Sequence, residues 1–164
     1  MVDSRRNGSV VTAASDRQPL MVAALGGAAI VAGGLVSAVN SAAPFAHGSW
    51  LSAYLVLVAG VSQLVLGIGA EALPVHQPPA TTRRAQVALW NLGNLAVAAG
   101  VLGDAPVAVA AGSGVLLVAL GSFALCVGRG RPQGRRWVVA YHATVATLAV
   151  SVGIGCALAG AAPG

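Results

Sequence analysis

The stretch APVAVAAGSGVLLVALGSFALCVGRGRPQGRR, residues 105–136, decides how this chain folds. Its first part, residues 105–127, is an unbroken apolar run. A helix rises by about 1.5 Å per residue, so a run of this length can cross a hydrocarbon core of about 30 Å. Its second part, residues 128–136, holds four arginines among glycines and a proline. An apolar run that ends in a basic connection is typical of a membrane span.

Four further runs have the same character. The sequence predicts transmembrane helices at about residues 20–39, 50–73, 85–103, 105–127 and 137–160. The connections are short and contain Pro and Gly, which favours helices that pack as antiparallel neighbours. The predicted fold class is therefore all-α: a polytopic integral membrane protein with five helices in an antiparallel bundle over residues 20–161.

Composition agrees with a lipid environment. Of the 164 residues, 57% are hydrophobic and 8% are charged, whereas a soluble domain has about 25% charged residues. The mean hydropathy is +0.81. The net charge of +5 does not indicate nucleic acid, because the arginines flank apolar runs and form no basic face. The expected partner is the lipid bilayer.

All nine basic residues are arginines, and they occupy alternate connections. They precede the first run, separate the second from the third, and separate the fourth from the fifth. The positive-inside rule places these connections in the cytoplasm. We expect a cell-membrane protein with the N-terminus inside and the C-terminus outside, and a mobile cytoplasmic segment at residues 1–19. The preference for Arg over Lys, with much Ala, Gly and Val, is typical of a GC-rich bacterial genome.

Residues 1–43 also share features with a secretory signal peptide. They have a basic start, an apolar run and the small residues Ser41-Ala42-Ala43. However, the run is longer than the roughly 7–15 apolar residues of a signal peptide, and Pro44 follows it. We therefore expect this run to remain as the first span.

Glycines recur at intervals of seven residues in every run. The sets are Gly26/Gly33, Gly60/Gly67, Gly93/Gly100, Gly114/Gly121/Gly128 and Gly153/Gly160. This period keeps a thin stripe toward a partner helix and favours close helix contact. We expect a tight bundle, and a homo- or hetero-oligomer formed through Gly-rich helix faces.

A faint internal repeat accompanies the glycines. The spacing of Arg17, Gly26 and Gly33 is the same as that of Arg84, Gly93 and Gly100. It could mark two helix hairpins related by duplication, with a fifth helix added.

Polar side chains within the spans are the first place to look for function. Gln63, Asn91, Asn94 and His142 are the candidates for a ligand-binding pocket. The amides could hold a small solute or a quinone-like head group, or could simply link helices. His142 could bind haem or transfer a proton, or could be a neutral histidine bonded to a carbonyl. Its helical register with Gly153 predicts that it points into the bundle.

His47 is a second candidate, as a polar site on the outer side. It belongs to Ala46-His47-Gly48-Ser49-Trp50, where Ser49 could cap the helix that follows. The predicted topology separates His47 from His142 by on the order of 20 Å, so they cannot share a metal. Cys126 and Cys156 are likewise expected at opposite ends of the bundle, which excludes a disulfide. No metal site is predicted.

The His-Gly-Ser-Trp start, followed by Tyr54 and Gln63, is distantly similar to helix starts in small haem-copper-oxidase-like membrane proteins over about twenty residues. The histidine pairs that bind haem in those families have no counterpart here, so no cofactor is predicted, although haem remains a possibility at His142. No phosphate loop, HExxH, nucleophile elbow or CxxCH is present. We therefore expect no catalytic residue. The leading hypothesis is a non-enzymatic accessory or scaffold subunit of a membrane complex. The alternative is a small-solute, quinone or haem-binding membrane protein.

Overall fold

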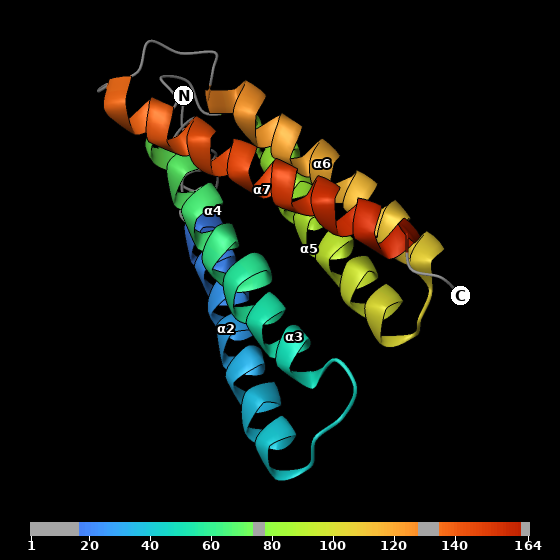
Figure 1. Cartoon of the computed structure of the whole chain (residues 1–164). Helices are drawn as coiled ribbons and strands as arrows, with labels where there is room; N and C mark the ends of the chain where they lie inside the picture. Colours follow the sequence, from blue (N-terminus) through green and yellow to red (C-terminus); the bar gives the residue numbers. More distant parts are fainter. Residues whose placement is uncertain (1–16, 74–77, 128–134, 162–164) are drawn as a thin grey trace, which may run out of the picture.

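The computed structural model describes residues 17–73, 78–127 and 135–161, and every element in these ranges is a helix. The elements are α2 (Arg17–Ala42), α3 (Gly48–Ala53), the π-helix η1 (Tyr54–Val61), α4 (Ser62–Ala72), α5 (Ala80–Leu102), α6 (Pro106–Val127) and α7 (Arg135–Ala161) (Figure 1). Because α3, η1 and α4 are continuous, they form one rod. Five helical rods are long and apolar enough to cross a membrane, which confirms that part of the predicted fold.

Most span boundaries lie within three residues of the prediction, and two of the differences change the reading of nearby residues. The helix α5 begins at Ala80, five residues before the predicted start, so that Arg83 and Arg84 lie within its first turns. Pro79, with ψ at 148°, sets this start, because a proline cannot continue a helix from before. The second span begins at Gly48, with His47 rather than Ser49 in the capping position. Most of the predicted mobile segment, residues 1–16, lies outside the described residues.

The first two rods form a hairpin, which we call the first hairpin: α2 against α3, η1 and α4. Glycines bring the helices close together. A methyl group at Gly26 would lie 2.9 Å from Cγ of Leu64 and 3.1 Å from the carbonyl oxygen of Gly60. Nearer the connecting loop, the hydroxyl of Ser52 donates a hydrogen bond to the carbonyl oxygen of Gly33 at 2.9 Å. Only glycine fits these positions without a shift of its neighbours.

The second hairpin, α5 against α6, has the same contact. A methyl group at Gly93 would lie 2.8 Å from Cγ of Leu116 and 3.2 Å from the carbonyl oxygen of Gly112. Gly100, like Gly33 in the first hairpin, faces the beginning of the returning helix, at Val109. The residues that suggest a sequence repeat therefore occupy equivalent places in two hairpins.

The glycine prediction is wrong for the last two helices. Around Gly114, Gly121 and Gly153 a methyl group would meet nothing within 4 Å. The glycine of α6 that does meet α5 is Gly112, where a methyl group would lie 2.8 Å from the backbone nitrogen of Val97. A seven-residue interval identifies a stripe on a helix, but it does not tell which of two stripes meets a neighbour. Gly128 lies outside the described residues.

The two hairpins diverge from each other. Their loops, around His47 and Asp104, lie at one end, which we call the loop end, and the opposite end is called the arginine end (Figure 1). At the arginine end, α4 contacts α7: the ring of Tyr141 lies against Gly69, and its hydroxyl is 3.5 Å from the carbonyl oxygen of Leu66. The hydrophobic core joins α4, α5, α6 and α7. Toward the loop end, α3 and η1 stand apart from α5, α6 and α7 and leave a cavity.

Candidate functional site: a cavity between the hairpins

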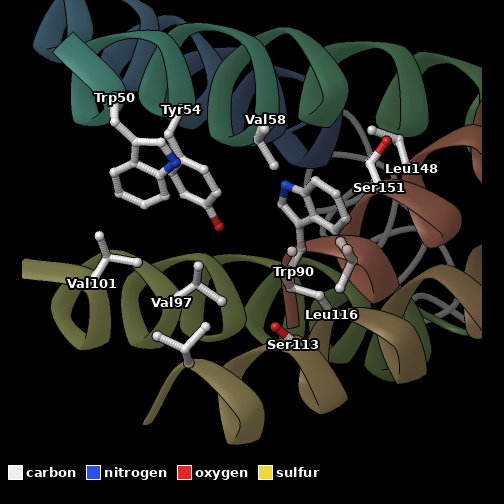
Figure 2. A pocket seen from close by; sticks show the side chains of 13 residues that line it. Trp50, Tyr54, Val58, Trp90, Val97, Val101, Ser113, Leu116, Leu148 and Ser151 are labelled. Carbon is white, nitrogen blue, oxygen red and sulfur yellow. The ribbon is translucent and has the colours of Figure 1, made fainter. Parts of the chain in front are cut away.

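The cavity has a volume of about 250 Å³ and lies between both hairpins and α7. Every helical rod except α2 contributes to its wall. The lining residues are Trp50, Tyr54, Val58, Trp90, Val97, Val101, Val109, Ser113, Leu116, Leu148, Ser151, Val152 and Gly155 (Figure 2). Most of these side chains are apolar, so the cavity suits an apolar molecule or part of one.

The first hairpin supplies an aromatic wall. The rings of Trp50 and Tyr54 stack with centroids 4.9 Å apart. Tyr54 and Val58 belong to η1, whose eight residues are wound as a π-helix. Such segments are rare and are frequent at functional sites. The hydroxyl of Ser62 donates to the carbonyl oxygen of Leu57 at 2.9 Å and so satisfies a backbone group at the end of this segment.

Two polar groups face the apolar wall from the second hairpin. Trp90 is 1% exposed, and its indole Nε1 has no hydrogen-bond partner. In Figure 2 this nitrogen points toward Val58 across the cavity. Ser113, on α6, is also buried and lines the same space. A buried donor without an acceptor is unfavourable by about 1–3 kcal/mol, so the indole favours a ligand that brings an acceptor.

A hydrogen bond between hairpins crosses beside the cavity. The hydroxyl of Tyr54 donates to Oδ1 of Asn94 at 2.8 Å. Nδ2 of Asn94 donates to the carbonyl oxygen of Trp90 at 2.8 Å, within the same helix. The amide of Asn94 is therefore held from one side by its own helix and from the other by η1. This arrangement holds η1 beside α5 next to the cavity.

A smaller space lies toward the arginine end, and we call it the arginine-end chamber. Its volume is about 30 Å³. Its polar lining residues are Gln63, Glu71, Arg83, Gln86 and Trp90. It shares only Trp90 with the larger cavity.

The predicted pocket residues do not line one common space in the described part of the chain. Gln63 lines the arginine-end chamber, and Asn94 makes the bond to Tyr54. Nδ2 of Asn91 donates to the carbonyl oxygen of Val87 in its own helix at 2.8 Å. Nδ1 of His142 lies 2.8 Å from the carbonyl oxygen of Val138, one turn earlier. A binding role for these residues stays a prediction.

The face of α7 that meets the core also differs from the expectation. Among residues 136–155 of this helix, Tyr141 and Val145 are buried, and Leu148 lines the cavity. Gly153, which shares the face of His142, is exposed. Of the small residues in the predicted stripe, Ala149 packs against the core and Gly153 does not, while Tyr141 makes the closest contact of α7 with α4.

His47 lies at the loop end, where its Nε2 is 3.9 Å from Oδ1 of Asp104. Both residues have positive φ, 64° and 48°, which places them in tight turns of the two hairpins. They are exposed, by 44% and 91% of their side chains, so this contact adds little stability. Across the described ranges no three His, Cys, Asp or Glu side chains group around a possible metal position.

Three important residues of the cavity are absent from the predicted site: Tyr54, Trp90 and Ser113. From the sequence, an aromatic residue in or near a span is expected to anchor the helix at the membrane interface or to pack against another helix. A serine in an apolar span is expected to bond to its own helix. Only the relative placement of the hairpins brings them together. No protein family, curated protein or solved structure matches the chain.

Proposed function

We propose that this chain is a membrane protein that binds a lipid-soluble molecule in the cavity between its hairpins. The ligand class is an apolar body with a hydrogen-bond acceptor, such as a quinone or another carbonyl-bearing amphiphile. The observation that carries the proposal is the indole Nε1 of Trp90, which is buried without an acceptor at an apolar cavity. With the arginine end placed in the cytoplasm by the positive-inside rule, the cavity would lie in the outer half of the cell membrane.

The dimensions of the cavity limit the ligand. Binding pockets for small molecules have volumes of about 300–1,000 Å³, and this one has about 250 Å³. It therefore suits a single ring or a segment of an acyl or isoprenoid chain, with the remainder of the molecule in lipid. The geometry gives no support to haem, because neither His47 nor His142 is among the lining residues.

Glycines of α7 offer a matched test. Gly155 lines the cavity, and a methyl group there would meet nothing within 4 Å, so we expect the side chain of Gly155→Leu to occupy part of the cavity. Gly153 is equally unobstructed but does not line the cavity, so Gly153→Leu is the control. Both variants are made in a Trp137→Phe background, which leaves Trp50 and Trp90 as fluorophores.

The measurement is quenching of tryptophan fluorescence by a short-chain benzoquinone, with the proteins in nanodiscs. The variants are compared at the same concentration of quinone in the lipid. We expect saturable quenching in the background protein and in Gly153→Leu, and only the linear collisional component in Gly155→Leu. Equal quenching curves for all three proteins would contradict binding in this cavity.

A role as an accessory or scaffold subunit is the second candidate. It is favoured by glycines at which an added methyl group would meet nothing within 4 Å: Gly27 and Gly34 on α2, and Gly114 and Gly121 on α6. Such faces allow another helix to approach closely. Loss of a co-purifying partner from Gly114→Leu, with retention in Gly153→Leu, would support this role. Gly93→Leu is unsuitable as a test, because Gly93 contacts Leu116 inside the hairpin.

A further inference from the structure

The arginine-end chamber collects polar groups that no protein atom satisfies. Gln63 is 4% exposed, and neither its Nε2 nor its Oε1 has a hydrogen-bond partner. Nε of Arg83 is buried and unpartnered as well. These groups all line the same small space. Buried polar atoms in proteins are satisfied with few exceptions, so a cluster of three such atoms points to an occupant.

The volume identifies the occupant. A water molecule needs roughly 10–15 Å³ of such space, so a chamber of about 30 Å³ has room for roughly two. A larger solute does not fit. The unpartnered atoms are N–H donors of Gln63 and Arg83 and the carbonyl oxygen of Gln63, and water can both accept and donate. Nearby, Nε2 of Gln86 is already occupied by a bond of 3.3 Å to Sγ of Cys126.

The chamber and the cavity follow one another along the length of the helices. Glu71 and Arg83 line the chamber close to the arginine end, and Trp50 and Val101 line the cavity close to the loop end. Trp90 is the residue common to both. It lies ten residues along α5, about 15 Å from the start of this helix and hence near mid-span. Its indole therefore separates a polar half from an apolar half.

We propose that the arginine-end chamber is a water-binding site that is reached from the arginine end, and that Trp90 is the barrier between it and the cavity. Water that enters the chamber from the arginine end is thus stopped at this side chain and does not reach the loop end. This inference is independent of the ligand proposed for the cavity. A hydrated chamber beside a cavity that binds no ligand would support this inference and not the proposed function. A dry chamber beside a cavity that binds a ligand would support the proposed function and not this inference.

Silver ions test the proposal, since they travel through water and are small enough for a narrow space. The background carries Cys126→Ser and Cys156→Ser, so that residue 126 keeps an acceptor for Gln86. Gln63→Cys is the reporter. Ala119→Cys is the control, because Ala119 is 0% exposed and lines neither space. An Asp104→Cys protein, reacted with an impermeant maleimide, identifies the loop end in sealed vesicles.

Silver is applied to one side, and the remaining thiols are then counted with a fluorescent maleimide after denaturation. From the arginine end, Gln63→Cys is expected to be blocked at least about tenfold faster than Ala119→Cys, because only a hydrated thiol ionises readily. From the loop end, Gln63→Cys is expected to stay unblocked while Trp90 is present. Adding Trp90→Ala, or Trp90→Leu if the first does not fold, is expected to open access from the loop end.

Two results would overturn the proposal. If Gln63→Cys is blocked as slowly as Ala119→Cys from the arginine end, the chamber is dry. If silver blocks Gln63→Cys equally fast from both ends while Trp90 is present, Trp90 is not the barrier. The same conclusion follows if silver added at the loop end fails to block Gln63→Cys in a folded Trp90 variant. The comparison of Gln63→Cys with Ala119→Cys, and the comparison of the two ends, both keep Trp90 in place. They therefore test the proposal even if the Trp90 variants fail to fold.

Discussion

The hydroxyl of Tyr54 donates a hydrogen bond of 2.8 Å to Oδ1 of Asn94, and it does so from one hairpin to the other. The hairpins have few other polar links among the described residues, and they diverge toward the loop end (Figure 1). Together with the hydrophobic core at the arginine end and the contact of Tyr141 with α4, this bond sets the relative position of the hairpins and therefore the shape of the cavity.

Tyr54→Phe is expected to lower the free energy of unfolding by about 0.6–1.7 kcal/mol, the range measured for hydrogen bonds between membrane helices. Unfolding in mixed micelles with increasing SDS provides the measurement. A double-mutant cycle with Asn94→Ala should show a coupling energy of similar size. Asn91→Ala is the control, because Asn91 bonds only to its own helix through Val87. Independent effects of Tyr54→Phe and Asn94→Ala would argue against a bond between the hairpins.

Gly112→Ala is expected to destabilise the second hairpin by about 1–3 kcal/mol, because the new methyl group overpacks the contact with α5. It would lie 2.8 Å from the backbone nitrogen of Val97, which cannot rotate away. Gly114→Ala, two residues later, meets nothing within 4 Å. It should be neutral or stabilising by up to about 1 kcal/mol, since alanine is the better helix former. Equal destabilisation by both changes, in the same unfolding assay, would contradict the assigned face.

His142→Leu is expected to change stability by less than about 0.5 kcal/mol, as is usual for positions away from buried contacts. The ring of His142 bonds to the carbonyl oxygen of Val138 within its own helix, and leucine fits a helix that faces lipid. Unfolding in SDS and the visible absorbance of the purified protein are the two measurements. A Soret band that disappears in His142→Leu would show a haem role that the geometry does not suggest.

The orientation is tested with single cysteines in a cysteine-free background. An impermeant maleimide added to intact cells is expected to label Asp104→Cys, where the side chain is 91% exposed, and not Arg84→Cys. The physical reason is that arginine-rich connections are retained in the cytoplasm. Labelling of both positions after the cells are opened is the control for reactivity. Labelling of Arg84→Cys alone in intact cells would reverse the proposed topology.

Sequence patterns predicted the spans well because each depends on local composition. The run at residues 105–127 and the helix Pro106–Val127 agree within a residue, since the turn at Asp104 and the basic connection limit it on both sides. The start of α5 was predicted too late, because Arg83 and Arg84 were assigned to the connecting loop. Arginines are tolerated in the first turns of a helix, and both lie there. The glycines of the first three spans indicated true contacts.

The candidate site could not be predicted from sequence in the same way. It depends on how two hairpins and α7 stand relative to one another, which no local pattern encodes. Trp90 illustrates this: beside Asn91 it reads as one more apolar residue, and only the assembled helices show that its nitrogen has no partner. The winding of η1, which aims Tyr54 at Asn94, also has no evident sequence signal.

The central claim, that the cavity holds a lipid-soluble ligand, is tested most directly by native mass spectrometry of protein extracted in mild detergent. The account predicts one bound species of constant mass in the wild type and in Gly153→Leu, and its loss in Gly155→Leu. No bound species in any of the three proteins, or the same species retained by Gly155→Leu, would contradict it.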